Sequence, residues 1–170
     1  MISEQKWAYL LLGSNLGDRE ILLKKALVQL ESLGQVASVS AFYETAAWGK
    51  TDQPAFLNCA VKIGCSLTPL ALLDGILAIE AALGRVRHEK WGARLMDIDI
   101  IFYGQEIIDL PGRLQVPHPQ MALRKFVLMP LAEIAPDFWH PVLHKTVQNI
   151  LDELHDTLPV RPWFGGEGIK

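Results

Sequence analysis

The stretch LMDIDIIFYG, residues 95–104, has the composition of a buried β-strand but contains two carboxylates. Side chains alternate between the two faces of a strand, so Asp97 and Asp99 are predicted to share one face. Ile101 and Tyr103 are expected on that face too. The other face is predicted to carry Met96, Ile98, Ile100 and Phe102. Two like charges about 6–7 Å apart repel each other, so both carboxylates face water or a cation lies between them.

The segments before this strand alternate between strand and helix patterns. Short apolar runs predict strands at residues 6–12, 35–43 and 56–63. Leucine and isoleucine at helical spacing predict helices at residues 18–33 and 69–83, each followed by a glycine. The order strand, helix, strand, strand, helix, strand predicts an α+β fold of the ferredoxin-like type, an antiparallel-rich sheet with helices packed on it.

The chain after residue 104 has weaker patterns. A hairpin arm and extended chain are predicted for residues 105–119, a short helix pair interrupted near Pro130 for 120–136, and a last helix for 146–154. Residues 1–157 are predicted to form a single domain. Residues 158–170 show no periodicity and are expected to be an extension that is either loose or docked.

Composition limits the class of protein. The 170 residues are half hydrophobic, which is enough for a sizeable core, and the formal net charge of −3 argues against a general nucleic-acid binder. Cys59 and Cys65 are the only cysteines, without the partner pair that a zinc site needs, and the chain is too large to be a disulfide scaffold. The N-terminal residues match neither a signal peptide nor a transmembrane helix. A cytoplasmic protein that does not act at a membrane is expected.

The Asp97-x-Asp99 pair allows two interpretations. Such a pair can simply lie on a solvated sheet edge. However, the preceding basic segment, residues 85–94, contains three arginines and a lysine. Carboxylates on a strand suit Mg²⁺, which leaves positions for phosphate oxygens, and arginine binds phosphate with two hydrogen bonds. A metal–polyphosphate site and a solvated edge remain equally open, whereas for the basic segment a functional lid is favoured slightly over a solvated loop.

Other side chains are candidates for a second ligand. Asn58 lies on an otherwise apolar strand face with Phe56, and a buried amide needs hydrogen-bond partners. Its donor and acceptor match the amide edge of a heterocycle. His118, between two prolines, is either a structural hydrogen-bonding residue or a phosphate contact. The chain has no P-loop motif, so a nucleotide would be bound in another way.

Four ordered blocks resemble one family. The blocks are LLGSNLGDRE (11–20), FYETAAWGKTDQPAFLNCAV (42–61), ALGRVRHEKWGARLMDIDIIFYG (82–104) and VPHPQMALRKFVLMPLAEIAP (116–136). Together they resemble 6-hydroxymethyl-7,8-dihydropterin pyrophosphokinase of folate biosynthesis, and KWGARLMDID (90–99) is the most specific part. The resemblance implies a catalytic domain that transfers pyrophosphate from ATP to the pterin hydroxymethyl group and releases AMP. It also implies two Mg²⁺ ions, a cytoplasmic location and small-molecule substrates, and we expect a monomer.

The resemblance also implies roles for individual residues. The ligands of both metal ions would be Asp97 and Asp99. The ATP-binding residues would be Glu80, Arg85, Arg94, Ile100 through its backbone, Arg113, His118 and Arg124. The pterin-binding residues would be Thr45, Trp48, Phe56, Asn58 and Phe126. The catalytic loop would contribute Arg87 and Trp91, so that the catalytic set is Arg85, Arg87, Trp91, Arg94, Asp97 and Asp99.

Two other classes of function remain as alternatives. A metal-dependent phosphohydrolase could use the D-x-D pair, but it would need more acidic or histidine ligands than the neighbouring sequence offers. A non-catalytic ferredoxin-like domain could bind a nucleotide or a pterin without turnover, because a fold alone does not determine function.

Overall fold

The computed structural model describes residues 5–45, 55–84 and 95–164. Within these residues the main sheet has six strands, which pair in antiparallel fashion. Its strands are β1 (Lys6–Ser14), β2 (Gln35–Val39), β3 (Tyr43–Thr45), β4 (Phe56–Cys65), β5 (Asp97–Tyr103) and β8 (Val160–Pro162). The order is β5-β1-β4-β3-β8, and β2 also pairs with β4. This is the predicted ferredoxin-like arrangement.

The remaining elements lie on or beside this sheet. They are α1 (Arg19–Leu30), α2 (Pro69–Ala82), the 3-10 helix η1 (Met121–Leu123), α3 (Lys125–Ile134), α4 (Val147–Glu153) and the hairpin of β6 (Ile108–Leu110) and β7 (Leu114–Val116). The starts of α1 and α2 follow from capping, since Asp18 and Thr68 each accept a hydrogen bond from a first-turn N–H at 3.2 Å. Among the described residues, no helix is long and apolar enough to cross a membrane.

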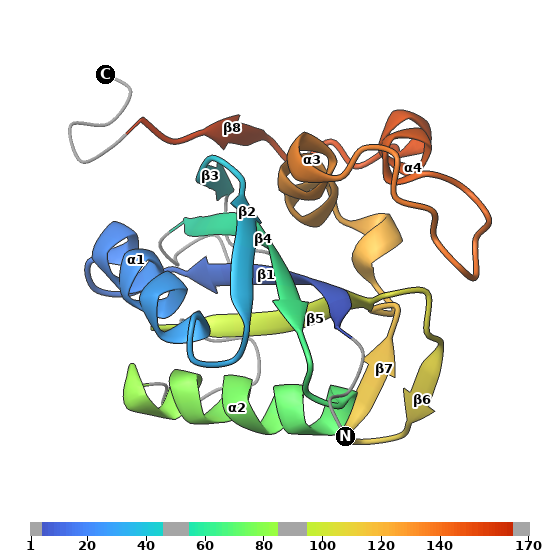
Figure 1. Ribbon diagram of the computed structural model, residues 1–170. Coiled ribbons are helices and arrows are strands. Elements are labelled where there is room, and N and C mark those ends of the chain that lie inside the picture. Colours follow the sequence, from blue (N-terminus) through green and yellow to red (C-terminus); the bar gives the residue numbers. More distant parts are fainter. Residues whose placement is uncertain (1–4, 46–54, 85–94, 165–170) are drawn as a thin grey trace.

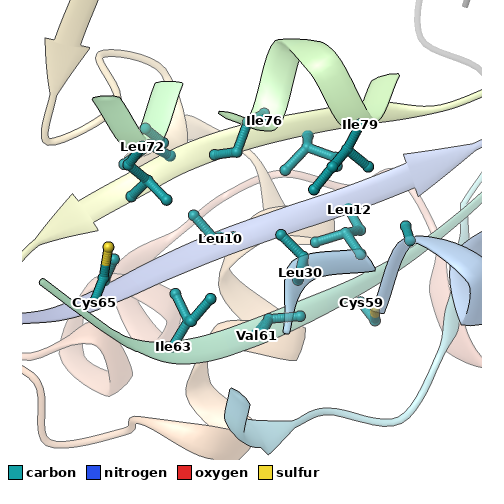
Figure 2. Packing of buried hydrophobic residues seen from close by; sticks show 14 of the residues in the cluster. Leu10, Leu12, Leu30, Cys59, Val61, Ile63, Cys65, Leu72, Ile76 and Ile79 are labelled. Carbon is teal, nitrogen blue, oxygen red and sulfur yellow. The ribbon is translucent and has the colours of Figure 1, made fainter. Parts of the chain in front are cut away.

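Helices cover both faces of the sheet (Figure 1). On one face, α1 and α2 pack on the apolar side chains of β1 and β4 and form with them a first apolar cluster. Figure 2 shows Leu72, Ile76 and Ile79 of α2 in this cluster, directed towards Leu10 and Leu12 of β1. On the other face, α3 and α4 enclose a second apolar cluster that includes Tyr9, Leu11, Ala60 and Phe102. The second cluster lies on the face that carries Asp97 and Asp99.

The predicted faces of β5 are correct at its start and wrong at its end. Leu10 pairs with Ile100, but Tyr9 pairs with Phe102, so Ile101 is the extra residue of a β-bulge. One extra residue reverses the alternation that follows it. Phe102 therefore lies in the second cluster, on the aspartate face, and Tyr103 lies in the first, the reverse of the prediction.

The single strand predicted for residues 35–43 is two strands, β2 and β3. Between them, Ser40 N donates to Ala60 O at 2.9 Å, and Ala60 N donates to Ser40 Oγ at 2.8 Å. A side-chain oxygen therefore takes the place of a backbone acceptor in the ladder. Since serine is suited to such local substitution, the ladder with β4 continues across the break.

The interruption predicted near Pro130 lies instead at Arg124, between η1 and α3. Pro130 is inside α3, and its side chain is buried. Proline removes one hydrogen bond from a helix interior, which costs about 3 kcal/mol. Burial of the Pro130 side chain offsets part of that cost, which periodicity alone does not reveal.

The C-terminal segment pairs with the sheet as far as it is described. Val160, Arg161 and Pro162 of β8 lie opposite Thr45, Glu44 and Tyr43 of β3. Trp163 N donates to Phe42 O at 2.8 Å, and the Trp163 side chain packs against the first cluster. As a result, the three-residue strand β3 lies between two neighbouring strands.

Candidate active site

The two aspartates lie at the end of the sheet where β1 ends and β4 and β5 begin. Asp97 is opposite Gly13 of β1, and Gly13 is opposite Asn58 of β4. Directly opposed residues project to the same face of a sheet. Two strand spacings separate Asp97 from Asn58, which places their Cα atoms roughly 10 Å apart. This aspartate face therefore presents a carboxylate pair and an amide within the length of a small ligand.

The carboxylate pair has the donor chemistry of a magnesium site. Asp97 and Asp99 alternate with buried Ile98 and Ile100 and are themselves partly exposed. Within the described residues, no group of three or more His, Cys, Asp or Glu side chains could hold a metal ion. Mg²⁺ typically takes one or two carboxylates and fills its other positions with water and phosphate oxygens. The residues present therefore fit Mg²⁺ with a phosphate ligand better than a metal held by protein alone.

Glu80 connects α2 to the strand of the aspartates. Its side chain is buried, and Oε2 accepts a hydrogen bond from Ile98 N at 2.7 Å. Ile98 is the residue between Asp97 and Asp99, and a hydrogen bond to a carboxylate is stronger than one between neutral groups. Glu80 therefore fixes the backbone that carries the two aspartates.

His118 and Arg124 lie close enough to the aspartates for their charges to interact. Burial lowers the pKa of Arg124, while Asp99 and then Asp97 act to raise it. Burial, and next the positive charge of Arg124, lower the pKa of His118, whereas Asp97 raises it. The net effect lowers the pKa of His118 and favours its neutral form. Its Nδ1 accepts from Gln120 N at 3.2 Å, which leaves the proton on Nε2.

Gln120 is a residue that the sequence analysis missed. Its backbone N–H binds His118, and its side-chain oxygen accepts a hydrogen bond from Arg124 Nη2. The Arg124 guanidinium also lies 5.7 Å from the ring centroid of Phe126. The available signal was the spacing of His118, Gln120 and Arg124 around a turn, but its meaning depends on the 3-10 helix that places them together.

Asn58 occupies a buried position with one unmet hydrogen-bonding group. Its Nδ2 donates to Leu12 O at 3.3 Å, but Oδ1 has no hydrogen-bond partner among the described residues. A buried acceptor without a partner is costly, so such a group often marks a ligand contact. The neighbouring residue Gly13 leaves the space for this amide, because a Cβ at Gly13 would lie 2.4 Å from Asn58 Nδ2.

Thr45 and Phe56 extend the Asn58 region. They lie opposite each other in the β3–β4 ladder, and Phe56 is two residues from Asn58, so all three project to the aspartate face. Thr45 Oγ1 is a second buried atom without a hydrogen-bond partner in the described part of the chain. Two unmet polar atoms beside a partly buried aromatic ring suit a flat ligand that has hydrogen-bonding edges.

Other predicted site residues have different surroundings. Ile100 is buried in the first cluster, so only its backbone remains available to a ligand. Arg113, in the turn between β6 and β7, forms an ion pair with Asp74 of α2 at 2.6 Å. Phe126 packs against the second cluster. Five predicted site residues lie outside the described residues: Trp48, Arg85, Arg87, Trp91 and Arg94.

Gly13→Ala is predicted to disable the Asn58 region without unfolding the protein. The added methyl group would displace the Asn58 amide, so the affinity for a ligand bound there should fall about tenfold. A pterin is the ligand that the family resemblance implies here, so isothermal titration of a pterin ligand and of an ATP analogue should show weaker binding of the pterin alone. Gly64→Ala, in the same ladder, is the control, since its nearest obstacle is the exposed Gln5 amide. Unchanged pterin affinity in Gly13→Ala would contradict this description of the pocket.

Comparisons with known proteins agree on one family. The sequence model of 7,8-dihydro-6-hydroxymethylpterin-pyrophosphokinase matches residues 9–136. The chain is 51% identical over 133 residues to the 2-amino-4-hydroxy-6-hydroxymethyldihydropteridine pyrophosphokinase of Methylorubrum extorquens, covering 76% of this chain and 83% of the relative. It is 42% identical over 155 residues to the protein of the same name from Synechocystis sp., covering 89% and 78%.

A solved structure supports the fold. The chain superposes on Plasmodium falciparum HPPK-DHPS, crystallised with pteroate, with a TM-score of 0.72 and 18% sequence identity. The match covers 88% of this chain and 42% of the Plasmodium chain, so this chain spans less than half the length of that protein. At this level of identity the likeness concerns the fold alone.

Proposed function

This chain belongs to the 7,8-dihydro-6-hydroxymethylpterin-pyrophosphokinase family, and we propose that it binds its two substrates side by side on the aspartate face. It is an ATP-dependent pyrophosphokinase of folate synthesis, which transfers pyrophosphate from ATP to the hydroxymethyl group of the dihydropterin. The observation that carries the proposed site is the row in which Asp97, Gly13 and Asn58 lie directly opposite one another.

The nucleotide is assigned to the β5 end of this row. Asp97 and Asp99 would be the protein ligands of two Mg²⁺ ions, and Arg124 would bind phosphate oxygens through its guanidinium. Neutral His118 would donate a hydrogen bond from Nε2 to the same phosphates. Glu80 would act by fixing the β5 backbone, which is the role its hydrogen bond to Ile98 N supports. When bound, Mg²⁺ supplies neutralisation of the polyphosphate charge.

The nucleotide site would be completed by Arg113 and by residues outside the described part of the chain. Arg113 would have to exchange its ion pair with Asp74 for a nucleotide contact, and both side chains are exposed enough for such an exchange. Arg85 and Arg94 are assigned to the phosphates, the Ile100 backbone to the nucleotide, and Arg87 and Trp91 to the catalytic loop, all on the strength of the family motif.

The pterin is assigned to the β3–β4 end of the row. Asn58 Oδ1 would accept a hydrogen bond from the amide edge of the pterin. This bond would give the buried oxygen the partner that it lacks among the described residues. Thr45 would supply a second polar contact, Phe56 and Phe126 would flank the ring, and Trp48 is assigned to the same ligand by the family motif. The Asn58–Leu12 hydrogen bond orients the amide before the ligand arrives.

The reaction requires that the pterin hydroxyl oxygen attack the β-phosphorus of ATP. A bond forms between that oxygen and the β-phosphorus, the hydroxyl proton is released to solvent, and the bond from the β-phosphorus to the α,β-bridging oxygen breaks, so AMP leaves. Transfer of this kind depends on positioning and charge neutralisation more than on covalent participation of the protein. The row of Asp97 and Asn58 supplies the positioning because both are fixed on paired strands.

We also propose a domain organisation, an oligomeric state and a cellular location for this protein. Residues 1–157 are assigned to one catalytic domain, with residues 158–170 as its extension, and a monomer in the cytoplasm is proposed. The two free, buried cysteines Cys59 and Cys65 support a reducing compartment.

The nucleotide product tests the proposed activity. Purified protein is incubated with ATP, Mg²⁺ and 6-hydroxymethyl-7,8-dihydropterin, and the nucleotides are separated by ion-exchange chromatography. AMP should appear in amounts equal to the pterin diphosphate and only when the pterin is present. ADP or free phosphate as the product would indicate a phosphohydrolase or another kinase, and binding without any product would indicate a non-catalytic domain.

A further inference from the structure

The Arg19 side chain contacts residues on both sides of the chain segment that connects β3 to β4. Its Nη1 donates to Ala55 O at 2.8 Å and forms an ion pair with Glu44 Oε2 at 2.8 Å. Glu44 directly precedes Thr45, and Ala55 directly precedes Phe56. One guanidinium of α1 therefore joins the end of β3 to the start of β4.

The C-terminal segment covers this guanidinium. The Trp163 ring lies over Arg19 Cζ with the centroid 4.9 Å away, within the range of a cation–π contact. Arg161 Nη2 approaches the other Glu44 oxygen at 3.5 Å. The β8–β3 pairing places Arg161 there, and the hydrogen bond from Trp163 N to Phe42 O holds Trp163 beside it. We call Arg19, Glu44, Arg161 and Trp163 the Arg19 cluster.

The members of the Arg19 cluster differ in their exposure. The Arg19 side chain is 19% exposed and the Glu44 side chain 17%, whereas that of Arg161 is 64% exposed. An exposed ion pair contributes little, while a partly desolvated pair under an aromatic ring contributes more. Arg19, Glu44 and Trp163 are therefore the effective members, and Arg161 is peripheral.

The Arg19 cluster lies on the opposite side of the sheet from the pterin residues. Glu44 faces Leu57 across the β3–β4 ladder, and Leu57 belongs to the first cluster, under α1 and α2. Thr45, Phe56 and Asn58 project to the aspartate face. The Arg19 cluster can therefore act on the pterin only through the backbone of β3 and β4.

We propose that Arg19, Glu44 and Trp163 position the pterin-binding end of the β3–β4 ladder, so that Arg19 and Trp163 are positioning residues for pterin specificity. The inference rests on the proposed assignment of Thr45, Phe56 and Asn58 to the pterin. Strand β3 has only three residues and ends at Thr45, and short strand ends open easily unless they are held. Through Glu44 and Ala55, Arg19 holds together the end of β3, which carries Thr45, and the start of β4, which carries Phe56.

Removing this contact should affect one substrate and not the other. Arg19→Ala is expected to raise the KM for the dihydropterin about tenfold, since a small displacement of positioning groups weakens a polar site. The affinity for an ATP analogue and kcat should stay within about twofold, because the β5 end of the row is untouched. Trp163→Ala should shift the pterin KM in the same direction, and it carries the test if Arg19→Ala does not fold.

Two matched variants serve as controls. Trp163→Phe should behave as the wild type, because the ring remains and the Trp163 indole N–H has no hydrogen-bond partner among the described residues to lose. Arg161→Ala should also leave the pterin KM unchanged, although it removes the same charge and also loses a contact with Glu44. In the double variant of Arg19→Ala and Trp163→Ala, the change should be smaller than the product of the single changes.

The outcomes separate this inference from the proposed function. Absence of pterin-dependent AMP formation by the wild type would go against the function itself. Normal wild-type turnover with unchanged pterin KM in both Arg19→Ala and Trp163→Ala would overturn the positioning role alone. Equal losses of pterin and ATP-analogue affinity would also overturn it, since they would indicate a general contribution to folding.

Discussion

Asp97→Asn is expected to lower the rate of AMP formation at least about a thousandfold while the protein remains folded, because a metal ligand contributes several kcal/mol of charge stabilisation. Asparagine has nearly the same shape as aspartate, and Asp97 is partly exposed at the start of β5. The backbone of this strand is held independently, by the ladder with β1 and by the bond from Ile98 N to Glu80. Asp99→Asn should have an effect of the same size.

The loss of the Asp97 carboxylate can also be detected by a measurement that does not depend on activity. The negative charge of Asp97 raises the pKa of His118, so its removal should lower that pKa further. An NMR titration of the histidine ring measures this shift. The control is Asp109→Asn, which removes an exposed carboxylate bound to Gln115 on the β6–β7 hairpin. Near-wild-type turnover in Asp97→Asn, with Mg²⁺ dependence preserved, would refute the metal assignment.

Asn58→Ala should weaken dihydropterin binding about ten- to a hundredfold, because each hydrogen-bonding group left without its buried partner costs about 1–3 kcal/mol. ATP-analogue binding should change little, since Asn58 is two strands away from Asp97. Calorimetry with each ligand separately measures the two affinities. The loss of the 3.3 Å bond to Leu12 O should lower the melting temperature slightly.

A surface amide provides the matched control for this substitution. Asn149 is exposed on α4, on a helix that contributes no residue to the proposed site, and Asn149→Ala should leave both affinities unchanged. If Asn58→Ala weakens both ligands equally, Asn58 supports the sheet and does not contact the pterin. If it weakens the ATP analogue alone, the assignment of the two ends of the row is reversed.

The fold could be predicted from the sequence because its signals are local. Leucine spacing with capping residues such as Asp18 and Thr68 locates the helices, and apolar runs locate the long strands. The bulge at Ile101 could not be predicted, because it depends on how β5 meets β1. The division of residues 35–43 at Ser40 and the intact helix around Pro130 likewise depend on tertiary contacts.

The site could be predicted only where residue type itself indicates the chemistry. Two carboxylates on an apolar strand and an amide on an apolar face, Asp97, Asp99 and Asn58, are conspicuous in sequence. Gly13 and Arg19 are not, since their importance arises from distant partners. Gly13 matters because it leaves room for the Asn58 amide, and Arg19 because it meets Glu44, Ala55 and Trp163 in space. Such partners are fixed by strand register, which the sequence does not display.

The most direct test of the central claim is a crystal structure of the protein with Mg²⁺, dihydropterin and an ATP analogue whose α,β-bridge cannot be cleaved. We expect Mg²⁺ bound by the carboxylates of Asp97 and Asp99 and by phosphate oxygens. We also expect the pterin amide edge hydrogen-bonded to Asn58 Oδ1, with the hydroxymethyl group directed towards the β-phosphorus. A structure with bound analogue in which neither carboxylate contacts metal, or in which the pterin lies away from β3 and β4, would contradict it.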